Sequence, residues 1–97
     1  MELTKQQLSK YNSKNDKKYI AVGGKIYDVS GKGDSFYGDG GAYSKLTGTD
    51  ASYRLATMNM GEIEEEKDLT DEQQKSLDSW INFFEKKYKS IGNLKKD

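Results

Sequence analysis

The sequence contains no cysteine and no histidine. Without cysteine there is no disulfide, no thiolate metal site and no cysteine nucleophile. Without histidine, the common zinc sites, the Ser-His-Asp triad and the ligation of a haem iron by two histidines are all excluded. We therefore expect a binding domain rather than an enzyme, with no catalytic residue of its own.

Long apolar runs are also absent. No stretch approaches the roughly 20 apolar residues of a membrane-spanning helix, and residues 1–20 lack the apolar centre of a signal peptide. There is no N-x-[ST] glycosylation site. We expect a soluble, cytoplasmic protein that would reach a membrane, such as the endoplasmic reticulum, only through a partner.

Apolar residues are scarce, at 33% of the chain, and charged residues make up another 33%. The length of 97 residues allows a single domain over residues 1–97. Its core must rely on aromatics, which are seven Tyr, three Phe and one Trp. A core this lean is marginal by itself. A ligand that binds only the folded state would stabilise the domain.

The charges balance, with 16 Lys and Arg against 16 Asp and Glu. Lysines gather toward both ends, and acidic residues gather in residues 62–66. A nucleic-acid-binding domain usually has a basic face with stacking aromatics, so zero net charge disfavours that function, and we expect no nucleic-acid partner. The acidic run reads as a solvent-exposed connection rather than a pair of catalytic carboxylates.

Two capping boxes, each a Thr followed three residues later by Gln, predict helix starts. They are Thr4 with Gln7 and Thr70 with Gln73. They predict a short helix over 5–10 and a long one over about 71–89, with Gly92 near the stop of the long helix. The apolar face of the long helix consists of Leu77, Trp80, Ile81, Phe84 and Tyr88. This spacing indicates core packing.

Two further features complete an α+β fold, in which a small sheet supports a helical half. Residues 19–22 and 25–29 are β-rich runs separated by two glycines, which predicts a tight hairpin. Ile26, with Val22 or Ala21, should face the core. Later, Asp50 would act as N-cap for a helix over 51–58.

A glycine-rich segment, residues 30–41, follows the hairpin. Long loops of this kind are usually functional or disordered. The segment lacks a phosphate-loop motif, an EF-hand order of ligands and a nucleophilic-serine motif. Tyr37 and Tyr43 lie on either side of its glycine bend, and 42–48 could form one or two helical turns. The pattern therefore favours a binding loop or a surface loop pinned by its aromatics.

Five segments in the same order resemble one known family. They are LTKQQLSKYN, IAVGGKIYDVS, FYGDGGAY, LTGTDASYRLAT and WINFFEKKYKSIG. The chain resembles the cytochrome b5-like haem/steroid-binding domain of the membrane-associated progesterone receptor family. Many relatives carry an N-terminal membrane helix, whereas this sequence begins directly at the domain. It is therefore similar to the short, soluble members. The resemblance implies a cytochrome b5-like fold with a helical pocket on a small sheet.

The resemblance also implies a binding site. Some members hold ferric haem through a tyrosine phenolate, which matches Tyr43 here. Tyr37 matches a second pocket tyrosine, and Lys87 with Tyr88 matches the family's lysine-tyrosine pair. Tyrosine is an established haem ligand, and ferric iron favours the ionised phenol over the neutral form. The expected cofactor is therefore five-coordinate ferric haem of low reduction potential, with Lys87 pairing a propionate or donating to Tyr43.

Alternatives stay open at this point. The same fold could carry a steroid or lipid without metal coordination, with Tyr43 packed in the core and Lys87 on the helix surface. It could also act as a protein-interaction adaptor through the acidic loop 62–68. The resemblance implies a partner such as a cytochrome P450, and either a monomer or a haem-mediated dimer.

Overall fold

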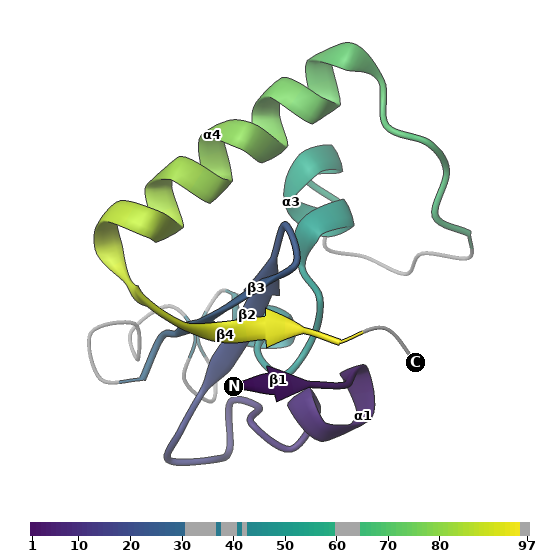
Figure 1. The fold of residues 1–97 in the computed structure, drawn as a ribbon. Helices are drawn as coiled ribbons and strands as arrows, with labels where there is room; N and C mark the ends of the chain where they lie inside the picture. Colours follow the sequence, from purple (N-terminus) through teal and green to yellow (C-terminus); the bar gives the residue numbers. More distant parts are fainter. Residues whose placement is uncertain (31–36, 38–40, 42, 60–64, 96–97) are drawn as a thin grey trace.

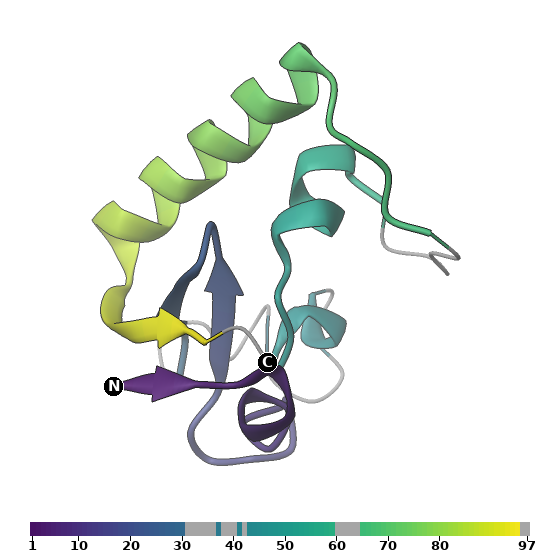
Figure 2. The ribbon, with the colours of Figure 1, turned by 45° about the vertical axis from the view of Figure 1, so that its right-hand side comes forward.

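The computed structural model of the protein describes residues 1–30, 37, 41, 43–59 and 65–95. In chain order the elements are β1 (Glu2–Leu3), α1 (Lys5–Leu8), β2 (Tyr19–Val22), β3 (Lys25–Asp28), the 3-10 helix η1 (Ser44–Leu46), α3 (Ser52–Thr57), α4 (Asp71–Lys87) and β4 (Lys89–Leu94). The tip of the β2–β3 hairpin points toward α4, which lies alongside α3, whereas α1 lies beside β1 (Figures 1 and 2). The predicted α+β class is confirmed.

The described strands form one sheet in the order β1-β4-β3-β2. β2 and β3 pair antiparallel around Gly23 and Gly24, whose φ angles of 60° and 83° are the positive values that such a turn requires. The predicted hairpin is therefore confirmed. β4 pairs antiparallel with β3 and parallel with β1, and neither β1 nor β4 was predicted from the sequence.

Gly92 lies inside β4, so its predicted role near the stop of the long helix is wrong. The helix ends at Lys87, and the chain turns directly into a strand that pairs with β3. Gly92 is needed there because a Cβ atom would collide with the main-chain carbonyl of Met1. The missing side chain lets β1 approach β4, where Asn93 N–H donates to the Met1 carbonyl oxygen over 2.9 Å.

We expect Gly92→Ala to destabilise the protein by roughly 1–3 kcal/mol, the usual cost of overpacking a tight contact. The neighbouring atom is main chain, so a change of rotamer cannot relieve the clash. Urea unfolding would measure the loss. Ser90→Ala, at an exposed position of the same strand, is the control and should stay within about 0.5 kcal/mol of wild type. Equal stability of the two variants would contradict this account of Gly92.

The core has two parts, because both faces of the sheet are covered. All four residues of β2 are buried. Ile20 and Val22 belong to the larger cluster, with α3 and α4, and Ala21 belongs to the smaller one with Ile26 and Leu8. The expectation that Val22 or Ala21 accompanies Ile26 toward one core holds for Ala21 only.

The helix starts follow the capping boxes closely. In both α1 and α4 the Thr side chain accepts from the main-chain N–H of the Gln three residues later. The side chain of that Gln accepts in turn from the main-chain N–H of the Thr. α1 ends at Leu8, two residues before its predicted end, and α4 ends at Lys87 instead of about 89. The turns expected at 42–48 are the single 3-10 turn η1.

The predicted cap is right in its bond and one residue off in position. The Asp50 carboxylate accepts from the Ser52 main-chain N–H over 3.1 Å, as a capping side chain does, but α3 begins at Ser52, and Ala51 at its N-cap position contributes no side-chain bond. Asp50 also forms a parallel bridge with Ala21 of β2. Its carboxylate accepts from the Ser52 hydroxyl over 2.7 Å, and that hydroxyl accepts from Gly23 N–H over 2.8 Å. Asp50 therefore links α3 to the hairpin, which holds the helical layer against the sheet.

Candidate functional site

Six side chains from three parts of the chain line one pocket, with a volume of about 110 Å³. They are Tyr37, Tyr43, Trp80, Phe83, Lys87 and Tyr88. We refer to this site as the aromatic pocket. All four predicted site residues are present in it. The glycines expected beside Tyr37 at positions 38 and 40 lie outside the described residues.

Trp80 and Phe83 were missed as pocket residues by sequence reasoning. Trp80 was assigned to the core-facing stripe of the long helix, and Phe83 was not singled out. Their rings meet edge to face at 5.7 Å, and Phe83 is 41% exposed. The available signal was the spacing of Trp80, Phe83 and Lys87, which places the three on one face of α4.

Tyr37 packs among other aromatic rings at the pocket. Its ring centroid is 6.1 Å from that of Tyr43 and 6.1 Å from that of Tyr88, and 6.4 Å from that of Phe84. These separations are typical of favourable aromatic pairs. Tyr37 and Tyr88 are buried, whereas Tyr43 is partly exposed. Tyr43 is therefore the most exposed of these three tyrosines.

Burial raises the pKa of Tyr37 well above that of an ordinary phenol, and so do the nearby Tyr88, its hydrogen bond with Tyr37, and Tyr43. Burial also raises the pKa of Tyr88, against a partial lowering by the hydrogen bond from Tyr37. Because both pKa values are raised above that of an ordinary phenol, both groups keep their protons at neutral pH. The pair therefore presents neutral hydroxyls at the base of the pocket.

The raised pKa of Tyr37 makes alkaline stability testable. The unfolded chain ionises this phenol near pH 10 while the folded chain retains the proton, so its contribution is full below pH 10 and falls as pH rises toward the folded pKa. The slope that one such tyrosine adds has an upper limit of about 1.4 kcal/mol per pH unit. Urea unfolding between pH 9 and 11.5 should show a shallower decline for Tyr37→Phe than for wild type. Parallel declines would contradict this assignment.

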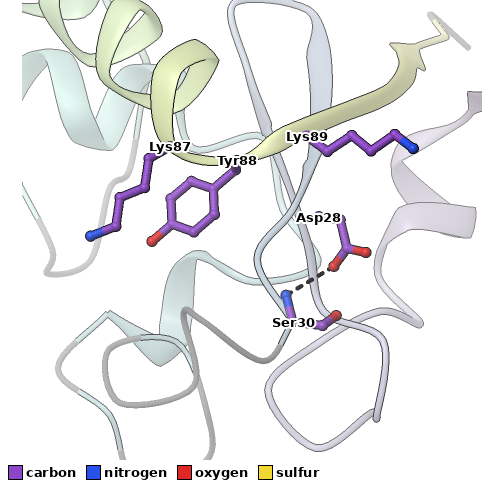
Figure 3. A pocket seen from close by; sticks show the side chains of 5 residues that line it. All are labelled: Asp28, Ser30, Lys87, Tyr88 and Lys89. Atoms are coloured by element: carbon purple, nitrogen blue, oxygen red, sulfur yellow. Dashed lines mark hydrogen bonds between the residues drawn. The ribbon is translucent and has the colours of Figure 1, made fainter.

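Lys87 and Tyr88 extend from the C-terminal end of α4 toward the same side (Figure 3). The Lys87 Nζ lies 5.2 Å from the Phe83 ring centroid and 5.8 Å from that of Tyr88. Both distances are within the range of cation–π attraction. The ammonium group is thus held at the rim of the aromatic pocket, where it can meet a negative group on a ligand.

The end of α4 is fixed by its contacts with β3. The Tyr27 hydroxyl donates to Glu85 Oε1 over 2.7 Å, and Lys25 Nζ lies 3.0 Å from the same oxygen. These bonds lower the pKa of Glu85 and keep it ionised. Phe84, fully buried, packs on Tyr27 with 5.5 Å between ring centroids. The helix that carries Phe83, Lys87 and Tyr88 is therefore anchored to the sheet.

The donor chemistry of this site is phenolic. Within the described ranges there is no group of three or more Asp or Glu that could hold a metal ion. None of the helices among the described residues has the length and apolar character to cross a membrane. Glu65, Glu66 and Asp68 are exposed, as expected for a solvated connection, and 62–64 lie outside the described residues.

Known proteins resemble this chain over nearly its whole length. Residues 4–94 match the family described as "Cytochrome b5-like Heme/Steroid binding domain". The chain is 39% identical to "Probable steroid-binding protein 3" of Arabidopsis thaliana, with 97% of this chain and 98% of that protein covered. The solution structure of a putative steroid-binding protein from Arabidopsis superposes with a TM-score of 0.84 at 38% identity, covering 98% of this chain and 97% of that one.

Other relatives are longer than this chain. "Cytochrome P450 regulator dap1" of Schizosaccharomyces pombe is 36% identical over 96% of this chain, which spans 62% of that protein. Human "Membrane-associated progesterone receptor component 2" is 38% identical over 94% of this chain, which spans 44% of that protein. An Arabidopsis structure described as having a cytochrome b5 like fold superposes with a TM-score of 0.81, so the fold expected from the resemblance is confirmed. The chain belongs to the cytochrome b5-like haem/steroid-binding domain family, among relatives of the membrane-associated progesterone receptor type.

Proposed function

We propose that this domain binds ferric haem in the aromatic pocket, with the Tyr43 phenolate as the iron ligand. The observation that carries the proposal is the meeting of Tyr37, Tyr43, Lys87 and Tyr88 in one pocket. They come from two parts of the chain that are far apart in sequence, 37–43 and 87–88, and sequence resemblance had singled out each of the four for haem. Binding and the regulation of a partner, rather than catalysis, are then the role of the domain.

The residues present fit the group. A planar ring can contact the aromatic lining of Tyr37, Trp80 and Phe83, and Tyr43 is the partly exposed tyrosine beside them. Bound haem would supply a ferric iron, which favours the ionised form of a phenol that it contacts. Tyr37 and Tyr88 keep their protons and serve as hydrogen-bond donors, and Lys87 supplies positive charge at the rim.

The size of the pocket limits how deeply a ligand can lie. A volume of about 110 Å³ is below the roughly 300–1,000 Å³ of typical small-molecule sites. A ring of porphyrin size would therefore fill the aromatic pocket and extend beyond it. An exposed ring face is the feature that would allow a haem-mediated dimer, and without the ligand we expect a monomer.

A steroid without metal coordination is the second candidate ligand. It is favoured by the aromatic lining and by the names of the Arabidopsis relatives, which are described as steroid-binding. A flat apolar sterol would use the same rings and would not need the Tyr43 oxygen. A partner such as a cytochrome P450 belongs to this proposal as well, since one relative is named as a P450 regulator. With such a partner the domain would act in the cytoplasm at the endoplasmic reticulum.

Hemin titration followed by absorbance tests the proposal. We expect a saturable change in the Soret region at one hemin per chain, and retention of the complex on gel filtration. The same titration in the presence of progesterone distinguishes the two ligands, because a shared pocket predicts competition. Absence of saturable hemin binding, together with sterol-induced protection of pocket amides from hydrogen exchange, would replace haem by a steroid.

A further inference from the structure

A second hollow adjoins the aromatic pocket and shares part of its lining. It is lined by Asp28, Ser30, Lys87, Tyr88 and Lys89 and has a volume of about 240 Å³ (Figure 3). Lys87 and Tyr88 line both sites. We refer to it as the polar hollow. A ligand that outgrows the aromatic pocket therefore has an adjacent polar space to enter.

The walls of the polar hollow are held in place by hydrogen bonds. The Asp28 carboxylate accepts from Ser30 N–H over 2.9 Å, and the Ser30 hydroxyl accepts from Lys18 N–H over 2.7 Å. Asp28 and Lys89 occupy paired positions of β3 and β4. The strand pairing thus sets the position of this wall relative to the end of α4.

The charges that line the hollow favour an anion by one unit. Lys87 and Lys89 contribute two ammonium groups, and Asp28 contributes one carboxylate. In Figure 3 the two lysine side chains extend to opposite sides of Tyr88. Lys89 is exposed, so its long side chain can turn toward a bound group at the cost of some rotamer freedom.

We propose that the polar hollow is a subsite for a carboxylate arm of the ligand, with Lys89 as the pairing residue. The inference rests on the proposed function and specifies the ligand class as a planar ring with an acidic edge. Lys87 would meet one acidic group at the rim of the aromatic pocket, and Lys89 would meet the next across Tyr88. The Asp28 carboxylate repels a ligand carboxylate, which lowers the affinity of the subsite for an anion. The repulsion favours ligands whose carboxylate reaches Lys89. A neutral sterol gains nothing from this subsite.

Hemin and hemin dimethyl ester form the test pair, because esterification removes the carboxylate charges and keeps the ring and the iron. We expect Lys89→Ala to weaken hemin binding by about two- to five-fold, the range for a solvent-exposed ion pair. Ester binding should stay unchanged. Asp28→Asn keeps an oxygen for Ser30 N–H and should tighten hemin binding, again without an effect on the ester. Lys75→Ala, at an exposed site of α4 outside both pockets, is the matched control.

Salt gives a second readout. Raising the ionic strength should reduce the difference between wild type and Lys89→Ala, since an exposed ion pair is screened. Equal effects of Lys89→Ala on hemin and on its ester, or no effect on either, would overturn the subsite and leave the proposed function intact. If wild type binds neither compound, the proposed function fails and the subsite fails with it.

Discussion

Tyr43→Phe is expected to weaken hemin binding by at least roughly 10- to 100-fold. Loss of a residue that only hydrogen-bonds to a metal-coordinating side chain usually lowers metal affinity by this factor. Loss of the coordinating side chain itself should lower hemin affinity at least as much. The substitution removes one oxygen and keeps the ring, whose centroid lies 6.1 Å from that of Tyr37. The aromatic packing of the pocket should therefore survive, because the ring is retained.

Titrations of both proteins with hemin would measure the effect, and the Soret band of any residual complex would report a changed iron ligand. Tyr53→Phe is the matched control, because Tyr53 lies on α3 and does not line the aromatic pocket. Progesterone binding, if it occurs, should be the same in wild type and Tyr43→Phe. Identical hemin titrations of wild type and Tyr43→Phe would remove Tyr43 as the iron ligand.

Local features of the fold could be predicted from the sequence because their causes lie within a few residues. Thr70 and Gln73 form reciprocal hydrogen bonds at the start of α4, and Gly23 with Gly24 forms the turn of the hairpin. β4 could not be predicted, because its residues KSIGNL include only two large apolar side chains and the strand is held mainly by pairing with β3 and β1. The role of Gly92 was also mispredicted because its cause is remote in sequence: the residue must lack a side chain where it packs against the main chain of Met1.

The candidate site likewise has residues that could be predicted from the sequence and residues that could not. The four residues of the haem prediction came from resemblance, and the structure brings them into one pocket. Phe83 was overlooked, although its spacing from Trp80 and Lys87 was available. The polar hollow could not be found from the sequence, because Asp28 and Lys89 come together only through the pairing of β3 with β4. A missed strand therefore also concealed part of the site.

Phe84→Ala should produce the largest loss of stability, about 3–5 kcal/mol, as expected for truncation of a buried Phe. Phe84 is 0% exposed, and its ring lies 5.4 Å from that of Tyr88, 5.5 Å from Tyr27 and 6.4 Å from Tyr37, measured between centroids. A small domain has only about 5–15 kcal/mol to lose. The variant should therefore be partly unfolded near 37 °C without ligand.

Phe83→Ala is the control that separates stability from binding. Phe83 is the next residue of α4 but is 41% exposed and lines the aromatic pocket. Urea unfolding of the ligand-free protein should show a much smaller loss than for Phe84→Ala, whereas hemin binding to folded Phe83→Ala should still be weaker. Hemin at a large excess over its Kd should recover part of the stability of Phe84→Ala, because ligand binding favours the folded state. Equal destabilisation by the two substitutions would mean that Phe84 is not the centre of the core beneath the pocket.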